Sequence, residues 1–278
     1  MSKATVRYYF GRLNLSGVFD SKHEVLLRTL SAAEPQRYRE HHWGVLELAE
    51  LVRDGSPMLT GYLAKYKPER KVEVAVPERH RLGTTSVQDS ITAKARFFLH
   101  VKTGIICHRV IGQDITASLF RRQFAAVVRA YNDGFFIDAR IETVEDEDRV
   151  IRALQSMDVV TRISVDLHPS NPGSRHIWRS LDERMQAVGV GRYREDYSAP
   201  EGSRKGLVVD EIVEQRLYMA EDGYGRATVE GTQDGHRRRV STDDNPATAE
   251  ASGDDAAAES VLDQLWSSFS DLFERFRS

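Results

Sequence analysis

Residues 96–111, RFFLHVKTGIICHRVI, contain two apolar runs rich in β-branched side chains, one on each side of the turn Lys102-Thr103-Gly104. This pattern predicts a β-hairpin, because such runs suit a half-buried strand and a short glycine-containing connection reverses the chain. Successive side chains of a strand point to opposite faces, so Cys107 and His108 are expected on opposite sides of the sheet. Cys107 is therefore predicted to be a buried structural residue and not a catalytic thiol.

A helix is expected directly after this hairpin. Apolar residues recur there at helical spacing, namely Ile115, Leu119, Phe120, Phe124, Val127, Val128 and Tyr131. Asp114 is predicted as the N-cap and Asn132-Asp133-Gly134 as the stop, and one helix face should pack on the sheet of the hairpin. A strand over 135–142, a helix over 145–156 and a strand over 159–167 follow. This order predicts an α+β fold with mixed sheets and packed helices, arranged as an α/β sandwich.

Further elements are predicted on both sides of this stretch. Before it come strands over 5–15, 43–52, 59–66 and 71–76, a helix over 24–30 and an exposed basic connection over 78–89. After it come helices over 174–188 and 207–220 and a hairpin formed by 226–231 and 237–241. We expect all of them to belong to one globular body, residues 1–242.

The composition changes sharply after this body. Residues 243–258 are small and acidic with almost no large apolar side chain, which is typical of a disordered linker. An amphipathic helix is predicted over 259–278, with one face made of Leu262, Leu265, Trp266, Phe269, Leu272, Phe273 and Phe276. An isolated helix of this kind needs a surface to cover its aromatic face. We assign this face to partner binding or self-association in a homo-oligomer or complex, with docking onto the chain's own body and membrane association as alternatives.

Charge and cysteine content limit the classes of function. The net charge is −3, but residues 1–242 alone carry about +4, a balance that permits nucleic-acid binding. The single cysteine excludes an intramolecular disulfide and a cysteine-based zinc site within one chain. No apolar run is long enough for a spanning helix and the N-terminus lacks a secretory pattern, so we expect a cytoplasmic protein.

Acidic residues on two predicted strands are candidate ligands of a catalytic metal ion. Asp138 and Glu142 share one face of a strand, and Asp158, Asp166 and His168 cluster around another. Converging carboxylates of this kind could hold the divalent ion of a nuclease. They also fit polar strand ends, and no phosphate-binding loop or nucleophile elbow accompanies them. We therefore predict no cofactor, no metal ligand and no catalytic residue.

Basic residues are the better candidates for binding. They could contact phosphate groups in a sequence-tolerant and salt-dependent manner. The predicted nucleic-acid-binding residues are Arg237, Arg238, Arg239, Arg121, Arg122, Arg175 and Arg179. A further set is concentrated early in the chain, at Lys65, Lys67, Arg70, Lys71, Arg79, His80 and Arg81.

One stretch resembles a known family. Ser86–Asp89, Phe97–Val101, the Thr103-Gly104 turn with Ile105–Ile111, and Asp114–Phe120 are similar to the RexA-type superinfection-exclusion proteins of temperate phages. The likeness covers about 80 residues and continues in layout from Ile137 to Leu167. It implies DNA binding and a role in anti-phage defence, and it transfers no catalytic residue. The acidic segment and the terminal helix depart from the family pattern.

Taken with the basic body, the resemblance leads to one principal expectation. The chain should be a non-enzymatic DNA-binding effector or sensor of a phage-exclusion system, with its terminal helix binding a partner or a second copy. A metal-dependent nuclease of a defence or toxin module is one alternative. A protein-interaction adaptor without a nucleic-acid role is the other.

Overall fold

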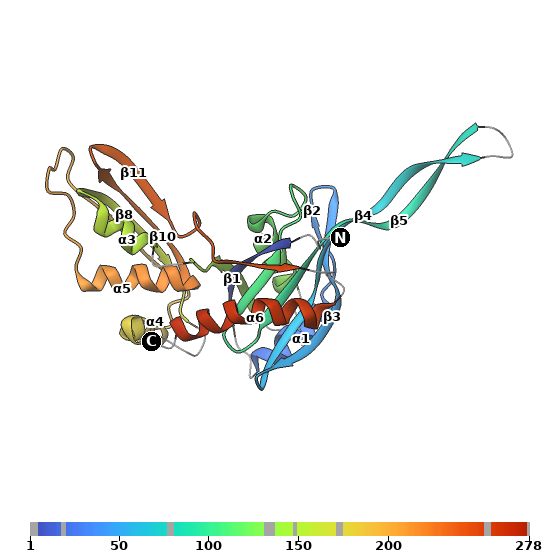
Figure 1. Ribbon diagram of the computed structural model, residues 1–278, viewed down its shortest axis with the longest axis horizontal. Coiled ribbons are helices and arrows are strands. Elements are labelled where there is room, and N and C mark those ends of the chain that lie inside the picture. Colours follow the sequence, from blue (N-terminus) through green and yellow to red (C-terminus); the bar gives the residue numbers. More distant parts are fainter. Residues whose placement is uncertain are drawn as a thin grey trace.

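The computed structural model of the chain describes residues 5–17, 21–76, 81–130, 137–146, 149–170, 175–252 and 257–276. Two sheets with their helices form two lobes, and a long hairpin projects from one of them (Figure 1). The predicted α+β class is confirmed. All pairings between the named strands are antiparallel, where the sequence predicted mixed sheets.

The larger sheet is built from the first half of the chain and closes with a late strand. Its strands are β1 (Thr5–Gly17), β2 (Gln36–Tyr38), β3 (His41–Arg53), β4 (Ser56–Val76), β5 (Arg81–His100), β6 (Ile105–Arg109), β7 (Ile137–Thr143) and β12 (Thr248–Ser252). The order across it is β12-β1-β6-β5-β4-β3-β2, with β7 also paired to β1. Strand β1 is thus paired with β6, β7 and β12 along its length.

Helices α1 (Lys22–Ala32) and α2 (Ala117–Ala130) cover one face of this sheet. The ring of Phe97 in β5 packs against that of Phe124 in α2 with centroids 5.0 Å apart, which confirms the predicted packing of this helix on the hairpin. The cap of α2 differs from the prediction. Thr116 Oγ1 accepts the backbone N–H of Leu119, while Asp114 forms an ion pair with Lys65. The predicted stop at 132–134 lies outside the described residues.

The opposite face is covered by the C-terminal helix α6 (Ala258–Arg275). Phe10 of β1 meets Phe269 edge-to-face with ring centroids 5.1 Å apart. Alternation along β6 sends buried Cys107 toward α6 and buried His108 toward α2, as predicted. The sheet is therefore sandwiched between α1 and α2 on one side and α6 on the other.

Two predictions for the C-terminal region are corrected. Residues 248–252, expected within a disordered linker, form β12, because their backbone pairs with the open edge of β1 and Ala251 packs into the core. Residues 253–256 of that linker lie outside the described residues. The face predicted to bind a partner is covered by the chain's own sheet, since Leu262, Leu265, Phe269 and Leu272 are all buried there. Docking onto the body, the alternative noted above, is what the structure shows.

The smaller sheet belongs to the second half of the chain. It has the order β11-β10-β8-β9, from β8 (Val159–Leu167), β9 (Tyr193–Ser198), β10 (Gly225–Gln233) and β11 (His236–Ser241). Its core also includes α3 (Arg149–Ser156), α4 (Arg179–Val188) and α5 (Glu211–Met219), with the short helical turns η2 (His176–Trp178) and η3 (Ala220–Tyr224). Strand β9 was missed because its sequence, YREDYS, is polar at most positions.

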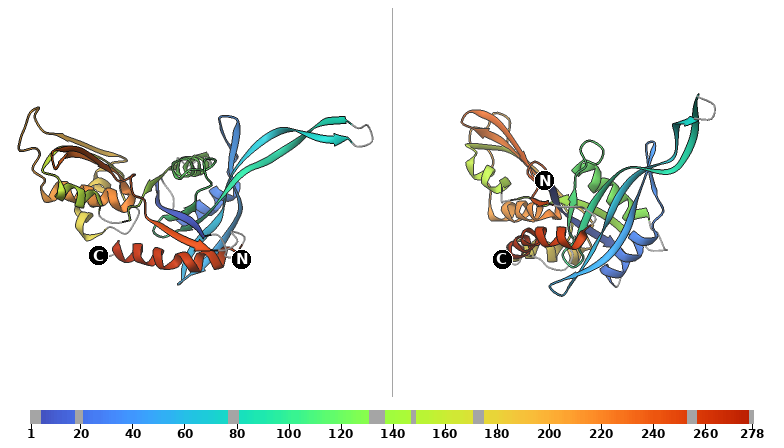
Figure 2. Two further views of the ribbon diagram at one scale, coloured as in Figure 1. Left: turned by 45° about the horizontal axis from the view of Figure 1, so that its top comes forward. Right: turned by 45° about the vertical axis from the view of Figure 1, so that its right-hand side comes forward.

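Strands β4 and β5 continue far beyond the sheet as a two-stranded arm. Their register runs from Met58↔His100 at the base to Val76↔Arg81 at the far end. Figure 2 shows the arm standing clear of both lobes in two views. The sequence predicted two separate strands and an exposed connection over 78–89. Residues 81–89 are instead strand, because a polar two-stranded ribbon keeps its backbone hydrogen bonds while both faces meet water; residues 77–80 lie outside the described residues.

The docking of α6 predicts a large loss of stability when its central ring is removed. Phe269→Ala should lower the free energy of unfolding by about 3–5 kcal/mol, because the ring is fully buried and its loss leaves a cavity. Ser267→Ala, on the exposed side of the same helix, should change it by less than about 0.5 kcal/mol. Equilibrium urea unfolding of the two variants measures both. Equal losses would contradict the docked arrangement.

Candidate functional site

The two lobes meet around the side chain of Arg12, which β1 presents toward α6 and η3. Its Nε donates to the backbone oxygen of Asp222 at 2.6 Å. Its Nη1 donates to the Thr103 backbone oxygen at 3.1 Å and to the Tyr224 hydroxyl at 2.7 Å. The guanidinium lies between the rings of Tyr224 and Phe276, about equally far from both. It is 2% exposed, and burial lowers the pKa of Arg12.

The close approach of η3 to β1 requires a glycine. Gly223 has φ +84°, in the left-handed region, and a Cβ there would lie 2.9 Å from the Cβ of Arg12. Its backbone oxygen accepts a hydrogen bond from the Asn14 side chain at 2.8 Å. A larger residue would push η3 away and expose the guanidinium.

Behind Arg12 lies a cluster of buried charges centred on Asp222, which is fully buried. Its Oδ2 accepts the indole N–H of Trp178 at 2.8 Å. Its Oδ1 lies 3.6 Å from both Arg175 Nη1 and Arg275 Nη2. The carboxylate thus joins η2 and the end of α6 to η3, while Arg12 hydrogen-bonds only neutral acceptors.

Two further acids, Glu145 and Glu221, are buried beside this cluster. Glu221 Oε1 accepts the backbone N–H groups of Val150 and Ile151, at the start of α3, at 2.7 and 3.0 Å. Burial raises the pKa of Glu145 to about 7, above its usual range. Arg275 Nη1 donates to the backbone oxygen of Glu145 at 2.8 Å. Arg275, at the end of α6, is thus bonded to the segment between β7 and α3.

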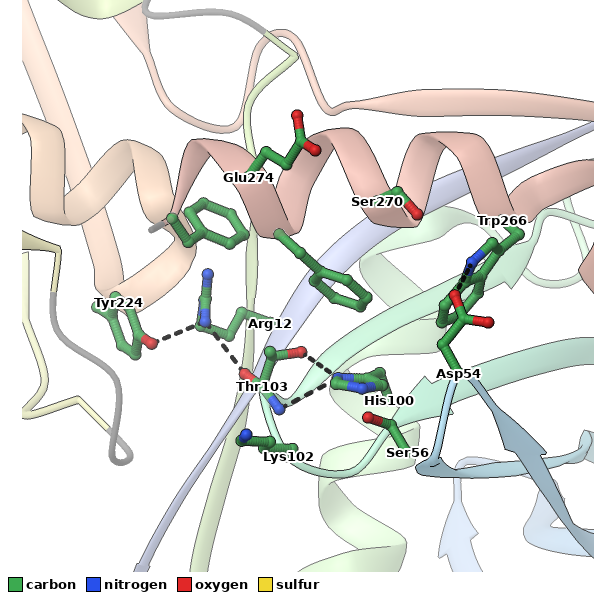
Figure 3. Close-up of a pocket in the computed structure, with 12 residues that line it drawn as sticks. Arg12, Asp54, Ser56, His100, Lys102, Thr103, Tyr224, Trp266, Ser270 and Glu274 are labelled. Carbon is green, nitrogen blue, oxygen red and sulfur yellow. Dashed lines mark hydrogen bonds between the residues drawn. The ribbon is translucent and has the colours of Figure 1, made fainter. Parts of the chain in front are cut away.

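A pocket of about 440 Å³ opens between α6 and the turn that joins β5 to β6 (Figure 3). Arg12 and Tyr224 stand at one end, and Trp266 and Asp54 at the other. The remaining lining residues are Ser56, His100, Lys102, Thr103, Ser270, Phe273, Glu274 and Phe276. Two features that the sequence predicted line this pocket, namely the β5–β6 turn and the aromatic face of α6.

His100 is positioned by the turn itself. Its Nδ1 lies 2.8 Å from Thr103 Oγ1 and accepts the backbone N–H of Thr103 at 3.3 Å. Burial lowers the pKa of His100 to about 4, so its ring is neutral at pH 7 with the proton on Nε2. Lys22 Nζ is buried near Gly104 without a hydrogen-bond partner among the described residues, and burial lowers its pKa to about 7.

The seven arginines predicted to contact nucleic acid are spread over separate elements. Arg121 on α2 pairs with Asp243, with 3.1 Å between Nη1 and Oδ1. Arg175 pairs with buried Asp222, as described above. Both side chains are mostly covered and have structural partners. The structure therefore does not join them to the other five in one binding surface.

The other five arginines are more accessible but do not converge. Arg122 is exposed on α2 and Arg179 is exposed at the start of α4. Arg237 and Arg239 are exposed on β11, an edge strand of the smaller sheet, while Arg238 turns to the other face and donates to Ser156 of α3 at 3.2 Å. Arg237 and Arg239 are thus two exposed members of the predicted set on one strand, and Arg239 Nε lies 3.6 Å from Glu230 Oε1.

The four carboxylates considered for a nuclease have other roles. Asp138 and Asp166 form ion pairs with arginines. Asp158 accepts the backbone N–H of Asp234 at 2.7 Å, and burial raises the pKa of Glu142. No group of three or more His, Cys, Asp or Glu side chains that could hold a metal ion occurs in the described part of the chain.

Sequence reasoning missed Arg12 and the pocket. Its only signal was one arginine within the apolar run YYFGRLNL, residues 8–15, where a charge on a buried strand demands a partner. That partner set comes from residues about 90 and 210 positions away, which no local pattern reveals.

A comparison with protein-family models relates the chain to a family. A family model described as DUF4747, a domain of unknown function, matches residues 6–265 and so extends over both lobes and into α6. No curated protein matches the chain. Among the described helices, none is long and apolar enough to cross a membrane.

The buried acids predict a specific pH dependence of stability. Because the pKa of Glu145 is raised to about 7, the folded protein keeps a proton that the unfolded chain releases above about pH 4.5. The contribution of Glu145 to stability therefore falls as pH rises from about 4.5 to 7 and is constant above. Glu145→Gln should match the parent protein near pH 4.5 and melt a few degrees higher at pH 8.

Thermal unfolding across this pH range measures the difference between the two proteins. Asp146→Asn, at the neighbouring exposed position, is the control and should show no such trend. A Glu145→Gln melting temperature that stays parallel to that of the parent protein at all pH values would contradict the assignment.

Proposed function

We propose that this chain, which belongs to the DUF4747 family, is a non-enzymatic nucleic-acid-binding protein that contacts duplex DNA with its β4–β5 arm. The observation that carries the proposal is the arm itself, a two-stranded ribbon projecting beyond both lobes (Figure 2). An isolated ribbon is at best marginally stable in water, so a role in contacting another molecule explains its length.

The polar face of the arm has side chains suited to phosphate contact. The register pairs Lys67 with Ser90 and Lys71 with Ser86, and alternation puts these four side chains on one face, together with Glu69, which accepts the Ser86 hydroxyl at 2.8 Å. Lys71 is exposed, and Lys67, at the base, is one-third exposed beside Glu40. Over residues 65–94 the sequence has seven lysines and arginines against four acids. This balance favours a polyanion over an acidic protein surface.

The dimensions of a ribbon also fit this ligand. The major groove of B-DNA, about 12 Å wide, admits a two-stranded β-ribbon. Lysines along the ribbon would then reach the phosphates that border the groove, while hydroxyl and amide side chains such as Ser86 and Gln88 meet base edges. Binding of this kind is strongly salt-dependent, because each neutralised phosphate releases condensed counterions.

The opposite face of the arm carries exposed apolar side chains beside polar ones such as Thr85. Val74, Val87 and Ile91 are 38%, 40% and 52% exposed, and alternation puts them on the same side of the ribbon. A second copy of the chain would present the same strip, and two such strips packed together would remove this apolar surface from water. We place the expected self-association on this face, with the polar faces left for DNA.

The arm proposal predicts which lysines matter. Lys67→Ala combined with Lys71→Ala should weaken binding to a labelled duplex about tenfold or more and reduce the slope of log affinity against log salt by roughly two. Replacing residues 68–89 by Asn-Gly should abolish binding and leave thermal stability unchanged, because the buried core clusters contain none of these residues. Fluorescence anisotropy at two salt concentrations, with sedimentation of the same samples, measures affinity and mass.

Arg237→Ala combined with Arg239→Ala is the matched control, since it also removes two positive charges from an accessible strand pair. It should retain the affinity of the parent protein. If this control loses affinity and the arm variants do not, DNA binding belongs to the β11 edge that the sequence predicted. No salt-sensitive binding by the parent protein to DNA or RNA would reject nucleic-acid binding altogether.

Phage exclusion, which the resemblance to RexA-type proteins implies, is part of the same proposal. Cells that produce the parent protein should reduce the plating efficiency of temperate phages, and cells with the shortened arm should not, because defence would depend on contact with DNA. Plaque counts on matched strains measure this. Unchanged plating with a well-produced protein would remove the defence role while leaving DNA binding to its own test.

A further inference from the structure

We propose that the pocket between α6 and the β5–β6 turn is a binding site for a mononucleotide, with the phosphate at the Arg12 end and the base at the Trp266 end (Figure 3). This inference is independent of DNA binding by the arm. It rests on an unsatisfied buried cation, an aromatic wall and a polar far end, which occur together in one cavity.

The cationic end of the pocket is formed by the guanidinium of Arg12. Among the described residues its three hydrogen bonds go to two backbone oxygens and the Tyr224 phenol, and the nearby Asp222 carboxylate acts on it through electrostatic attraction but accepts none of these bonds. Its Nη2 is buried and has no hydrogen-bond partner among the described residues, although the side chain lines the pocket. A buried guanidinium with an unused donor is costly unless an anion completes it. Guanidinium geometry favours phosphate or carboxylate as that anion.

Lys102 adds positive charge near the same end, and Lys22, whose pKa burial lowers to about 7, is partly charged at neutral pH. Lys102 lines the pocket from the β5–β6 turn and is exposed, so it can move toward a bound anion. Lys22 Nζ lies beneath the turn beside Gly104, again without a hydrogen-bond partner among the described residues. The two acids that line the pocket, Asp54 and Glu274, are both exposed. Arg12 and Lys102 therefore make this end of the cavity the more basic one, with buried Asp222 as a partial counter-charge.

The wall of the pocket is aromatic. Phe273 contacts the His100 ring at 4.5 Å between centroids and is itself only half-buried, as is Trp266. The rings of Trp266 and Phe273 meet edge-to-face with centroids 5.9 Å apart. Such partly open rings offer a stacking surface to a planar base. Inorganic phosphate would leave that surface uncovered.

The far end is suited to the edge of a base. Asp54 Oδ2 accepts the indole N–H of Trp266 at 2.9 Å and, as a carboxylate, retains further capacity to accept base N–H groups. Ser56 and Ser270 line the same cavity with hydroxyl groups. The volume of about 440 Å³ lies within the range of about 300–1,000 Å³ that is usual for small-molecule sites. Along the pocket, the guanidinium would thus bind the phosphate, the aromatic rings would stack on the base, and the polar far end would contact the edge of the base.

Isothermal titration calorimetry with adenosine 5′-monophosphate, adenosine and inorganic phosphate tests the site. The nucleotide should bind at least about tenfold more tightly than either half, because only it reaches both ends of the pocket. Guanosine 5′-monophosphate is titrated as well, so that a site that prefers guanine to adenine is also detected. Inorganic phosphate that binds as tightly as both nucleotides would overturn the aromatic half of the proposal. No heat with either nucleotide up to millimolar concentration would overturn it entirely.

Four variants test the location of the site. Lys102→Ala and Trp266→Ala should each weaken nucleotide binding about tenfold or more, through the phosphate and base ends respectively. Lys205→Ala removes an exposed lysine far along the chain and should leave affinity unchanged. Arg12→Lys is a more severe test, read together with its melting temperature because Arg12 also joins the lobes. Nucleotide affinity that survives both Lys102→Ala and Trp266→Ala would place binding elsewhere and reject the pocket.

The protein with the shortened arm separates this inference from the proposed function. It should bind the nucleotide as tightly as the parent protein, since residues 68–89 do not line the pocket. If shortening the arm abolished nucleotide binding, the nucleotide would be bound at the arm as a mimic of nucleic acid. This result would overturn the pocket assignment.

Discussion

Burial of the Arg12 guanidinium between two sheets is the constraint on which the rest of the architecture depends. A charge in the middle of an apolar strand is tolerable only if its N–H groups find acceptors. The structure supplies them from the β5–β6 turn and from η3, at the entrance to β10. The same contact requires Gly223, brings Asp222 into the core and attracts the counter-charges Arg175 and Arg275. The lobes are thus joined by directional polar contacts.

Helix α6 depends on the same junction. Its apolar face is buried on the sheet through Phe269 and its neighbours, and its last turn delivers Arg275 and Phe276 to the charged cluster. It also forms one wall of the pocket. Movement of α6 would therefore change the sheet core, the lobe junction and the pocket together, which makes this helix the element through which a ligand could be sensed.

The arm and the pocket divide the molecule into two chemically distinct regions. The arm is remote from the buried clusters, so its sequence is free to serve contact with another molecule. The pocket is built from the junction and cannot change without cost to the fold.

The sequence by itself determined most local structure. Periodicity located the β5–β6 hairpin, α2, β8 and α6, and alternation assigned Cys107 and His108 to opposite faces, because these features depend on neighbouring residues. Local patterns could not reveal β12 or the length of the arm, since a small acidic or polar segment becomes a strand only when an edge or a partner strand satisfies its backbone. They also could not show that α6 covers its own sheet.

Only the tertiary structure decided the site. The partners of Arg12 come from distant segments, and the arginines that the sequence grouped by charge proved to be separated or already paired. A run of basic residues in the sequence shows only that positive charge is present. A binding site also requires that these side chains lie close together after folding and are not neutralised by acidic partners. That outcome depends on long-range packing, which places Arg12 against neutral acceptors and leaves Nη2 buried without a hydrogen-bond partner among the described residues, while the side chain lines a cavity.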